Sequence, residues 1–199
     1  GKTGPCTEAI IKAGIARVFI GSIDPNPLVC GQGIAHLTEN GVETTLVADD
    51  ACEAHLDPFR KFIQKKMPWV HLKVASTLDG QLATQTGASK WITGPAARRA
   101  SHQIRAQSDG VMVGIGTALA DDPQLNVRDV DGTSPTAIIL DSSLKIPESS
   151  RCLTEGTMIF HGAVYDEAKA KRLITNLGVR TFQVQEHGGR LDLNEVLSV

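Results

Sequence analysis

The amino-acid sequence predicts an α/β protein built in two parts, and three observations support this prediction. Segments with apolar residues at helical spacing alternate along the whole chain with short runs rich in β-branched residues. Glycines such as Gly14 and Gly41 follow the helical segments, as is common at helix ends. After Lys66 the pattern changes and repeats nothing from the first half. We therefore expect one domain over residues 1–66 and a second over residues 67–199.

The first part is predicted to hold three helices and two strands. The helices are expected over residues 6–14, 33–41 and 51–66, and the strands over residues 16–23 and 42–47. The first strand is β-branched and apolar, so we expect it to be buried. Pro25 and Pro27 mark a turn after it. Pro58 falls within the third helical pattern and predicts that this helix begins later than Glu53.

The second part is predicted to hold a longer alternation. Strands are expected over residues 69–76, 81–84, 109–114, 136–141, 156–162 and 179–184, with a polar loop after residue 114. Helices are expected over residues 95–106, 167–177 and 191–199. The chain begins at Gly1 rather than at a methionine and stops at Val199 within a helical pattern. We therefore expect an internal piece of a longer protein.

Composition excludes several classes of protein. An apolar fraction of 41% is enough to bury a core, and a net charge of −2 argues against a general binder of nucleic acid or membrane surfaces. No apolar run approaches the ~20 residues of a membrane span. The four cysteines are scattered, without a C-x-x-C pair, which favours reduced thiols and a cytoplasmic protein.

Residues 77–94 are dense in Gly, Ser, Thr and Trp, a composition typical of loops that contact polar ligands and also of ordinary surface turns. The helix that follows places Arg98, His102 and Arg105 on one face. Such a basic stripe can bind a phosphate, because arginine offers a bidentate fork. Taken alone, a solvated helix face is the favoured interpretation of this stripe.

Residues 109–128 join a predicted strand to a G-x-G turn and then to an Asp-Asp-Pro sequence. Leu119 stands where the dinucleotide fingerprint needs its third glycine, so the Rossmann signal is weak. Asp121 and Asp122 suit a metal or acid–base role, but an aspartate before proline is as often a turn or cap residue. Cys6 follows a proline at a helix start and suits zinc, yet no second ligand is visible nearby. Taken alone, it and the other three cysteines are interpreted as buried structural thiols.

Taken together, these segments resemble the bacterial bifunctional riboflavin-biosynthesis deaminase/reductase family. The resemblance runs in one register from Gly1 to Arg128, with a weaker match at residues 139–143. It rests on the following motifs: GKTGPC, AIIKAGIARV, DPNP, G-x-G, KVASTLDG, SKWITG, ARR, IRAQSD, VG-x-GT, DDPQLNVR and ILDSS. The fold class that it implies is α/β, with a partial cytidine-deaminase-like α/β/α domain followed by a partial dihydrofolate-reductase-like α/β domain.

For residues 1–66 the resemblance implies the C-terminal part of a zinc-dependent deaminase domain, in which zinc activates a water molecule for attack on a pyrimidine ring. Cys6 matches the last zinc-binding cysteine of that family's signature. The other ligands and the catalytic Glu are expected upstream of Gly1. This fragment is therefore not expected to deaminate by itself.

For residues 67–199 the resemblance implies the N-terminal part of an NADPH-dependent reductase that converts the ribosyl side chain of a phosphoribosylamino-uracil to ribityl. The positions that match the family's dinucleotide contacts are Ala75, Trp91, Thr117, Asp121 and Ser142. The positions that match its substrate contacts are Ser89, Arg105, Leu125 and Arg128, and Lys73 could serve in the same site. In this register Arg98 and His102 keep the interpretation of solvated residues, and no metal is expected in the reductase domain.

Three hypotheses follow from the resemblance. The first is a bifunctional enzyme of riboflavin biosynthesis, and the alternative to it is a reductase with a degenerate, non-catalytic deaminase domain. The third is a non-catalytic nucleotide-binding module. In each case we expect a homo-oligomer that binds a small pyrimidine ribotide or nucleotide and has no nucleic-acid or membrane partner.

Overall fold

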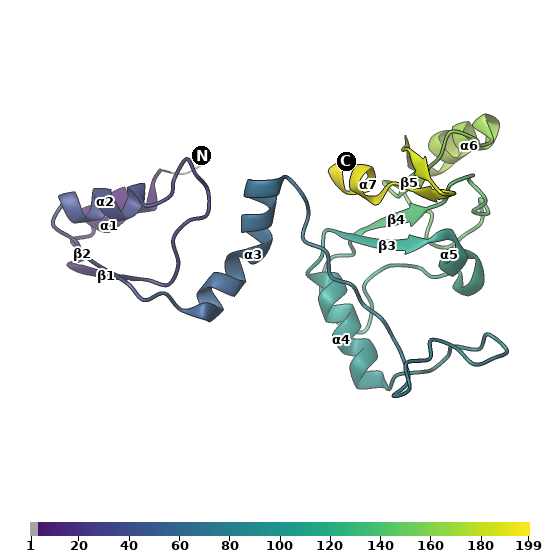
Figure 1. Cartoon of the computed structure of the whole chain (residues 1–199), viewed down its shortest axis with the longest axis horizontal. Coiled ribbons are helices and arrows are strands. Elements are labelled where there is room, and N and C mark those ends of the chain that lie inside the picture. Colours follow the sequence, from purple (N-terminus) through teal and green to yellow (C-terminus); the bar gives the residue numbers. More distant parts are fainter. Residues whose placement is uncertain (1–3) are drawn as a thin grey trace. The chain divides into compact units, whose positions relative to one another are not determined.

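A computed structural model describes residues 4–199, and the chain divides into two compact units. The first unit ends at His71 and the second begins at Leu72. Both units are α/β in composition, as the sequence predicts (Figure 1). Among the described residues no helix is both long and apolar enough to cross a membrane.

The first unit contains a two-stranded parallel sheet. Its elements are α1 (Cys6–Lys12), β1 (Arg17–Ile20), α2 (Gln32–Glu39), β2 (Glu43–Leu46) and α3 (Asp50–Lys65). The two strands pair in parallel from Arg17 opposite Glu43 to Ile20 opposite Leu46, and α2 forms the crossover between them. The helix α2 packs against β2, and α1 packs against α2. All five elements lie within segments that the sequence predicts, apart from the first residue of α2 and of α3.

The core of this unit is small, and the prediction of a buried first strand is wrong. Among the described residues of the first unit, only Leu37 and Val42 are buried hydrophobic residues. On β1, Phe19 keeps 64% of its surface exposed. A strand is buried only when layers cover both faces of its sheet, and within residues 4–71 the helix packed on this sheet lies against β2.

The helix α3 begins before Pro58, which corrects the predicted later start. It starts at Asp50, because the side chain of Asp49 accepts hydrogen bonds from the backbone N–H groups of Ala51 and Cys52, at 2.9 and 3.1 Å. Arg60 forms ion pairs with Glu53 and Asp57, and these span the position of the proline. An interior proline removes one hydrogen bond from the helix, and here the cap and the ion pairs offset that loss.

The second unit begins with an irregular segment, so the strands predicted over residues 69–76 and 81–84 are not formed. A strand needs a hydrogen-bonding partner, and no described residue pairs with this stretch. Local turns take the place of the strands. Gly80 N–H donates to the carbonyl of Thr77 at 3.0 Å, and Gly87 N–H donates to the carbonyl of Thr84 at 2.9 Å.

A four-stranded parallel sheet forms the centre of the second unit, in the order β3-β4-β5-β6. Its strands are β3 (Gly110–Gly114), β4 (Thr136–Leu140), β5 (Met158–His161) and β6 (Arg180–Gln183), and the helices are α4 (Pro95–Ala106), α5 (Ile115–Asp121), α6 (Glu167–Leu177) and α7 (Leu193–Ser198). The bounds of α4 and α6 are those predicted. The helix α5 replaces the expected polar loop, and the hairpin of β7 (Glu186–His187) and β8 (Arg190–Leu191) was not predicted.

Alternate residues of the two central strands, β4 and β5, face two separate cores. On one face Ile139 and Ile159 pack with Ala118 of α5 and with Leu173 of α6. The buried side chains on the other face are Phe160, Val184, Leu191 and Val196, with Ile138, Leu140, Met158 and Phe182 packed against them. Because each connection between neighbouring parallel strands is normally right-handed, α5 and α6 are expected to cover the same face, and they do. The carboxyl ends of the four strands therefore meet at one edge of the sheet.

Candidate functional site

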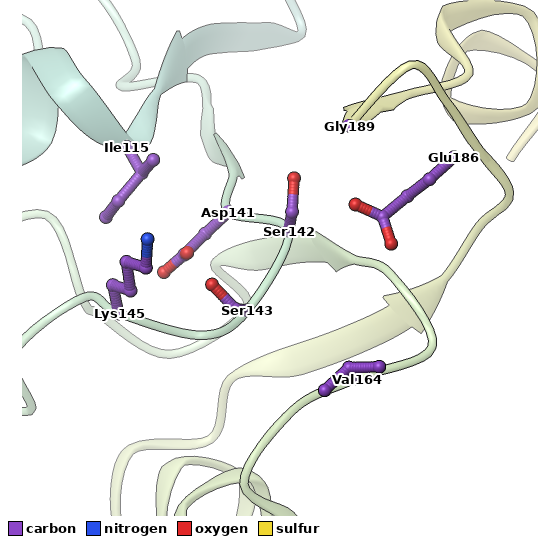
Figure 2. Close-up of a pocket in the computed structure, with 8 residues that line it drawn as sticks. All are labelled: Ile115, Asp141, Ser142, Ser143, Lys145, Val164, Glu186 and Gly189. Atoms are coloured by element: carbon purple, nitrogen blue, oxygen red, sulfur yellow. The ribbon is translucent and has the colours of Figure 1, made fainter.

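A cavity of about 340 Å³ lies at the carboxyl end of β4 (Figure 2). The residues that line it are Ile115, Asp141, Ser142, Ser143, Lys145, Val164, Glu186 and Gly189. Ligands of open α/β sheets bind outside the carboxyl ends of the strands, which is where this cavity lies. Two hydroxyls and one ammonium group lie on the β4 side of it, and the Glu186 carboxylate lies on the opposite side.

The turn after β4 is held by Asp141, which is fully buried. Its Oδ2 accepts a hydrogen bond from the backbone N–H of Ile146 at 2.8 Å, and its carbonyl accepts one from Leu144 N–H at 3.1 Å. Leu144 has a φ of +53°, a left-handed conformation that a leucine adopts only when its surroundings hold it there. Asp141 therefore fixes the loop that presents Ser142, Ser143 and Lys145 to the cavity.

The second oxygen of this carboxylate, Asp141 Oδ1, is buried without a hydrogen-bond partner among the described residues. A buried carboxylate oxygen without a partner is costly, and such sites in native proteins call for a water molecule, an ion or a ligand. Asp141 was not among the residues proposed from the sequence, although it belongs to the ILDSS motif that identified Ser142.

The opposite wall of the cavity depends on Gly162. Its N–H donates to the carbonyl of Ser142 at 2.8 Å, which ties the end of β5 to the loop after β4. A Cβ atom at this position would lie 2.1 Å from Glu186 Oε2 and 2.4 Å from Glu186 Cδ, so any side chain here would displace Glu186. No pattern in the sequence indicated Gly162 or Glu186, because their contact joins the residue that follows β5 to a residue of β7.

A second group of polar residues lies where α4 meets the loop over residues 125–129. Arg105 Nη1 donates to the carbonyl of Asn126 at 2.8 Å, and Arg128 Nη1 donates to Asn126 Oδ1 at 3.1 Å. Leu125, in the same loop, is buried and has a φ of +53°. The structure thus brings together three of the four predicted substrate residues, and it adds Asn126 as the residue that contacts both arginines. The fourth, Ser89, has no contact with this group among the hydrogen bonds of the described residues.

The two arginines lie close enough to repel each other. Burial lowers the pKa of the Arg105 guanidinium, and the charge of Arg128 lowers it further. Two cations held side by side despite their repulsion attract an anion, and a phosphate can accept hydrogen bonds from both. This group of residues, Arg105, Asn126 and Arg128, is called the paired-arginine site below.

The interpretation of His102 as a solvated residue is wrong. Only 6% of His102 is exposed, and its Nδ1 accepts a hydrogen bond from the backbone N–H of Arg128 at 3.2 Å. Burial lowers the pKa of His102, and the charges of Arg105 and Arg128 lower it further, while Asp129 opposes them. The sequence places His102 and Arg105 on one helix face but does not show that the loop over residues 125–129 covers this part of it.

Arg98 is also more than a solvated residue. Its guanidinium lies over the ring of Trp91 at 4.3 Å from the ring centroid, and its Nη1 donates to the carbonyl of Thr93 at 2.7 Å. Trp91 nevertheless keeps 71% of its surface exposed. A cation stacked on an indole ring fixes the orientation of the ring. The irregular segment is thereby tied to the start of α4.

The predicted cofactor residues are distributed over several elements. Ser142 lines the cavity, and the other four predicted cofactor residues are not among its lining residues. Thr117 lies exposed on α5, and Asp121 is the last residue of the same helix. Ala75 and Trp91 lie in the irregular segment.

Asp122, the second aspartate of the Asp-Asp-Pro sequence, has a structural role. Its Oδ1 accepts from the backbone N–H of Arg151 and its Oδ2 accepts from Arg151 Nε, both at 2.9 Å. Arg151 Nη2 also donates to the backbone carbonyl of Asp122. The contact fixes the end of α5, where Asp122 has a φ of +39°. It agrees with the turn and cap alternative for this residue.

Three of the four cysteines are exposed, namely Cys6, Cys30 and Cys52, so the interpretation of these as buried thiols is wrong. Cys152 is buried as expected, and burial raises the pKa of its thiol. Residues 4–199 contain no group of three or more His, Cys, Asp or Glu side chains that could hold a metal ion. The described residues therefore do not provide a zinc site by themselves, and Cys6 could supply one ligand at most.

Comparisons with known proteins identify the family. A sequence profile described as the RibD C-terminal domain matches residues 68–199. The riboflavin biosynthesis protein RibD of Bacillus amyloliquefaciens is 45% identical over 205 aligned residues, which cover 100% of this chain and 54% of that protein. The corresponding protein of Actinobacillus pleuropneumoniae is 39% identical and covers 99% of this chain and 53% of its own length.

Two solved structures agree with this result. Acinetobacter baumannii RibD is 37% identical, with a TM-score of 0.81 over 100% of this chain and 55% of its own. A diaminohydroxyphosphoribosylaminopyrimidine deaminase/5-amino-6-(5-phosphoribosylamino)uracil reductase from Thermotoga maritima is 32% identical, with a TM-score of 0.71 over 92% of this chain and 58% of its own.

The second unit thus has an α/β fold with a parallel sheet, similar to the fold of the RibD reductase domain. The chain belongs to the RibD family, and residues 68–199 belong to the RibD C-terminal domain. The chain spans about half the length of the relatives it matches.

Proposed function

We propose that residues 67–199 form part of the reductase of riboflavin biosynthesis, which uses NADPH to reduce the ribosyl side chain of 5-amino-6-(5-phosphoribosylamino)uracil to ribityl. The observation that carries this proposal is the paired-arginine site. Arg105 and Arg128 share Asn126 as an acceptor and repel each other, an arrangement suited to a phosphate. The phosphate of this ribotide is a natural occupant of such a site.

The cavity at the end of β4 fits part of the cofactor. Ser142 and Ser143 offer hydroxyl donors and Lys145 offers a positive charge, a set of groups that suits a phosphorylated nucleotide. When bound, NADPH supplies the hydride. The role of the chain is to hold the ribotide by its phosphate and the cofactor at the sheet edge, because hydride transfer depends chiefly on the positioning of its two partners.

We assign residues 1–66 to the C-terminal part of a zinc-dependent deaminase domain that acts on diaminohydroxyphosphoribosylaminopyrimidine. Support comes from the relatives that span this region, one of which carries both activities in its name. Cys6 would supply one zinc ligand in the full-length protein. The alternative is a degenerate domain that does not bind zinc, and zinc analysis of the full-length protein separates the two.

We also propose that the protein is cytoplasmic and that it forms a homo-oligomer. Light scattering of the purified protein tests the oligomeric state.

The test of the reductase is NADPH oxidation by the purified full-length protein with the aminouracil ribotide as substrate. We expect a ribitylamino product in equimolar amount to the NADPH consumed. Binding of both ligands without oxidation would instead support a non-catalytic nucleotide-binding module. The variant Arg128→Ala tests the role of the paired-arginine site in binding the ribotide. Arg99→Ala, which removes an exposed arginine of α4, is its control.

A further inference from the structure

We infer that His102 is a positioning residue for the paired-arginine site: its Nδ1 holds the backbone of Arg128, and so sets the loop that carries both Asn126 and Arg128. The inference rests on the proposed function of that site in substrate binding. We do not assign His102 a direct contact with the phosphate. It acts through the main chain of Arg128.

The geometry fixes the protonation of the ring. The backbone N–H of Arg128 donates to Nδ1 at 3.2 Å, so Nδ1 must present a lone pair and the proton of the neutral imidazole lies on Nε2. Nε2 lies 3.9 Å from Asp129 Oδ2. The ring therefore contacts two successive residues of the loop, one through each nitrogen, and from a buried position on α4.

The loop needs such support because its backbone is unfavourable on its own. Leu125 has a φ of +53° and Asp129 a φ of +66°, so two residues without the freedom of glycine adopt the left-handed region within five positions. Between them Arg128 donates its N–H to His102, and Val127 donates its N–H to Ser134 Oγ at 3.0 Å. These two hydrogen bonds hold the centre of the loop, and the one that His102 accepts is donated by Arg128 itself.

The charged groups around the ring favour its neutral form. Arg105 on α4 and Arg128 on the loop both lower the pKa of His102, after the larger effect of burial, and Asp129 raises it. The folded protein therefore keeps His102 neutral at pH values somewhat below 6.5, where the unfolded chain already binds a proton. Protonation at Nδ1 would set an N–H against the N–H of Arg128 and add a third positive charge. The loop is then expected to leave its position as the pH falls through the pKa of the folded state.

Three substitutions in the full-length protein distinguish positioning from bulk. The amide oxygen of His102→Asn can occupy the place of Nδ1 and accept from Arg128 N–H, whereas that of His102→Gln lies nearer the place of Nε2. His102→Leu fills the space without any acceptor. We expect about a tenfold rise in the KM for the ribotide in the Leu and Gln variants, the size of one lost hydrogen bond, with the KM for NADPH changed by less than about twofold. The Asn variant should stay within about threefold of the wild type.

The pH dependence of the KM for the ribotide also tests the inference, because a merely structural role of His102 would not change it. Wild-type KM for the ribotide should rise at acidic pH more steeply than that of His102→Asn. The phosphate of the ribotide itself ionises near pH 6 in both proteins, so the difference between the profiles isolates the histidine. Equal rises in both KM values, or a Leu variant with unchanged KM for the ribotide, would overturn the inference, as would identical pH profiles for the wild type and the Asn variant.

Three further measurements separate the role of His102 from a general loss of folding. Thermal unfolding of each variant detects a general loss of folding. Adding His102→Leu to Arg128→Ala should raise the KM for the ribotide by a smaller factor than His102→Leu does in the wild type, because part of its effect passes through Arg128. Calorimetry of the weak binding of inorganic phosphate tests the role of His102 without catalysis. Phosphate binding that is lost in the Leu variant and kept in the Asn variant supports the inference even if the protein oxidises no NADPH, and equal binding by both contradicts it.

Discussion

Arg151, in the connection between β4 and β5, donates hydrogen bonds both to the carboxylate and to the backbone carbonyl of Asp122. The contact joins two segments that are 29 residues apart in the chain. It lies directly before Pro123 and the loop that carries Leu125, Asn126 and Arg128. The ion pair thus fixes the end of α5, from which the chain leads into the loop over residues 125–129.

Asp122→Asn is expected to lower stability at neutral pH and to have no effect in strong acid. The backbone N–H and the side chain of Arg151 lower the pKa of Asp122 below 3.8, and the backbone hydrogen bond is the largest cause. A lowered pKa contributes stability above the unfolded value of about 3.8, and this is lost as the pH falls through the folded value. Urea unfolding of both proteins from pH 7 to pH 2 checks this. A difference that persists unchanged at pH 2 would contradict it. Arg151→Lys, which keeps the charge but not the fork, serves as the control.

Arg128→Ala should weaken binding of the ribotide far more than binding of NADPH. The loss of a charge-assisted contact to a phosphate costs on the order of 1.5–3 kcal/mol, or about 10- to 150-fold in affinity. Calorimetry with each ligand separately measures both effects. Arg99→Ala is the matched control and should leave both affinities within about twofold. If Arg128→Ala weakens both ligands equally, this arginine does not bind the substrate phosphate.

Asp141→Ala should destabilise the second unit by about 1–3 kcal/mol, because it leaves the buried N–H of Ile146 without an acceptor. Asp141→Asn keeps an acceptor for that N–H and should cost less. Chemical unfolding of the two variants measures the difference. The interpretation of Asp141 as the residue that holds the turn would fail if the two variants were equally unstable.

Gly162→Ala should lower the thermal stability and weaken NADPH binding, because the new methyl group clashes with Glu186 and displaces it from the wall of the cavity. The double variant Gly162→Ala with Glu186→Ala removes the clash and should recover most of the lost thermal stability. Differential scanning calorimetry gives the stability and fluorescence titration the cofactor affinity. No recovery in the double variant would show that the backbone, rather than Glu186, excludes a side chain here.

Cys6→Ser in the full-length protein should abolish zinc retention and deaminase activity while the reductase stays active. The reason is that a hydroxyl is a far weaker zinc ligand than a thiolate. Elemental analysis of the purified protein and the two separate assays check the result. Cys30→Ser, at another exposed cysteine, is the control. Full zinc content in the Cys6 variant would exclude it as a ligand.

The sequence predicted local features of the fold well, and its errors concern contacts between distant segments. The helices at residues 95–106 and 167–177 follow from local spacing and match the structure at both ends. The extended stretch at residues 69–76 has strand composition but no strand beside it, and composition cannot reveal that. The start of α3 is an exception, because the contacts that place it before Pro58 are local: the cap at Asp49 and the ion pairs of Arg60 stabilise the first turns of the helix despite the proline.

Some residues of the candidate site could likewise be predicted from sequence motifs, and others only from the folded structure. Arg105, Leu125 and Arg128 came from the resemblance of motifs, and the structure places them together. The sequence led to the wrong interpretation of His102 and provided no indication of four other residues, namely Asn126, Asp141, Gly162 and Glu186. All five make hydrogen bonds or contacts that only the folded chain forms. A buried histidine and a solvated one look alike in a sequence.

The order of the strands in the second unit has a consequence for how the chain folds during synthesis. Among the described residues, each strand of this sheet pairs with the strand that comes next in the chain, so these three pairings do not wait for a segment made much later. The entropic cost of closing the connection between two successive strands grows only slowly with its length. Folding that starts at β3 can therefore proceed strand by strand as the ribosome releases the chain. Pulse proteolysis of stalled nascent chains of increasing length should show protection that rises in steps, with one step for each strand after β4.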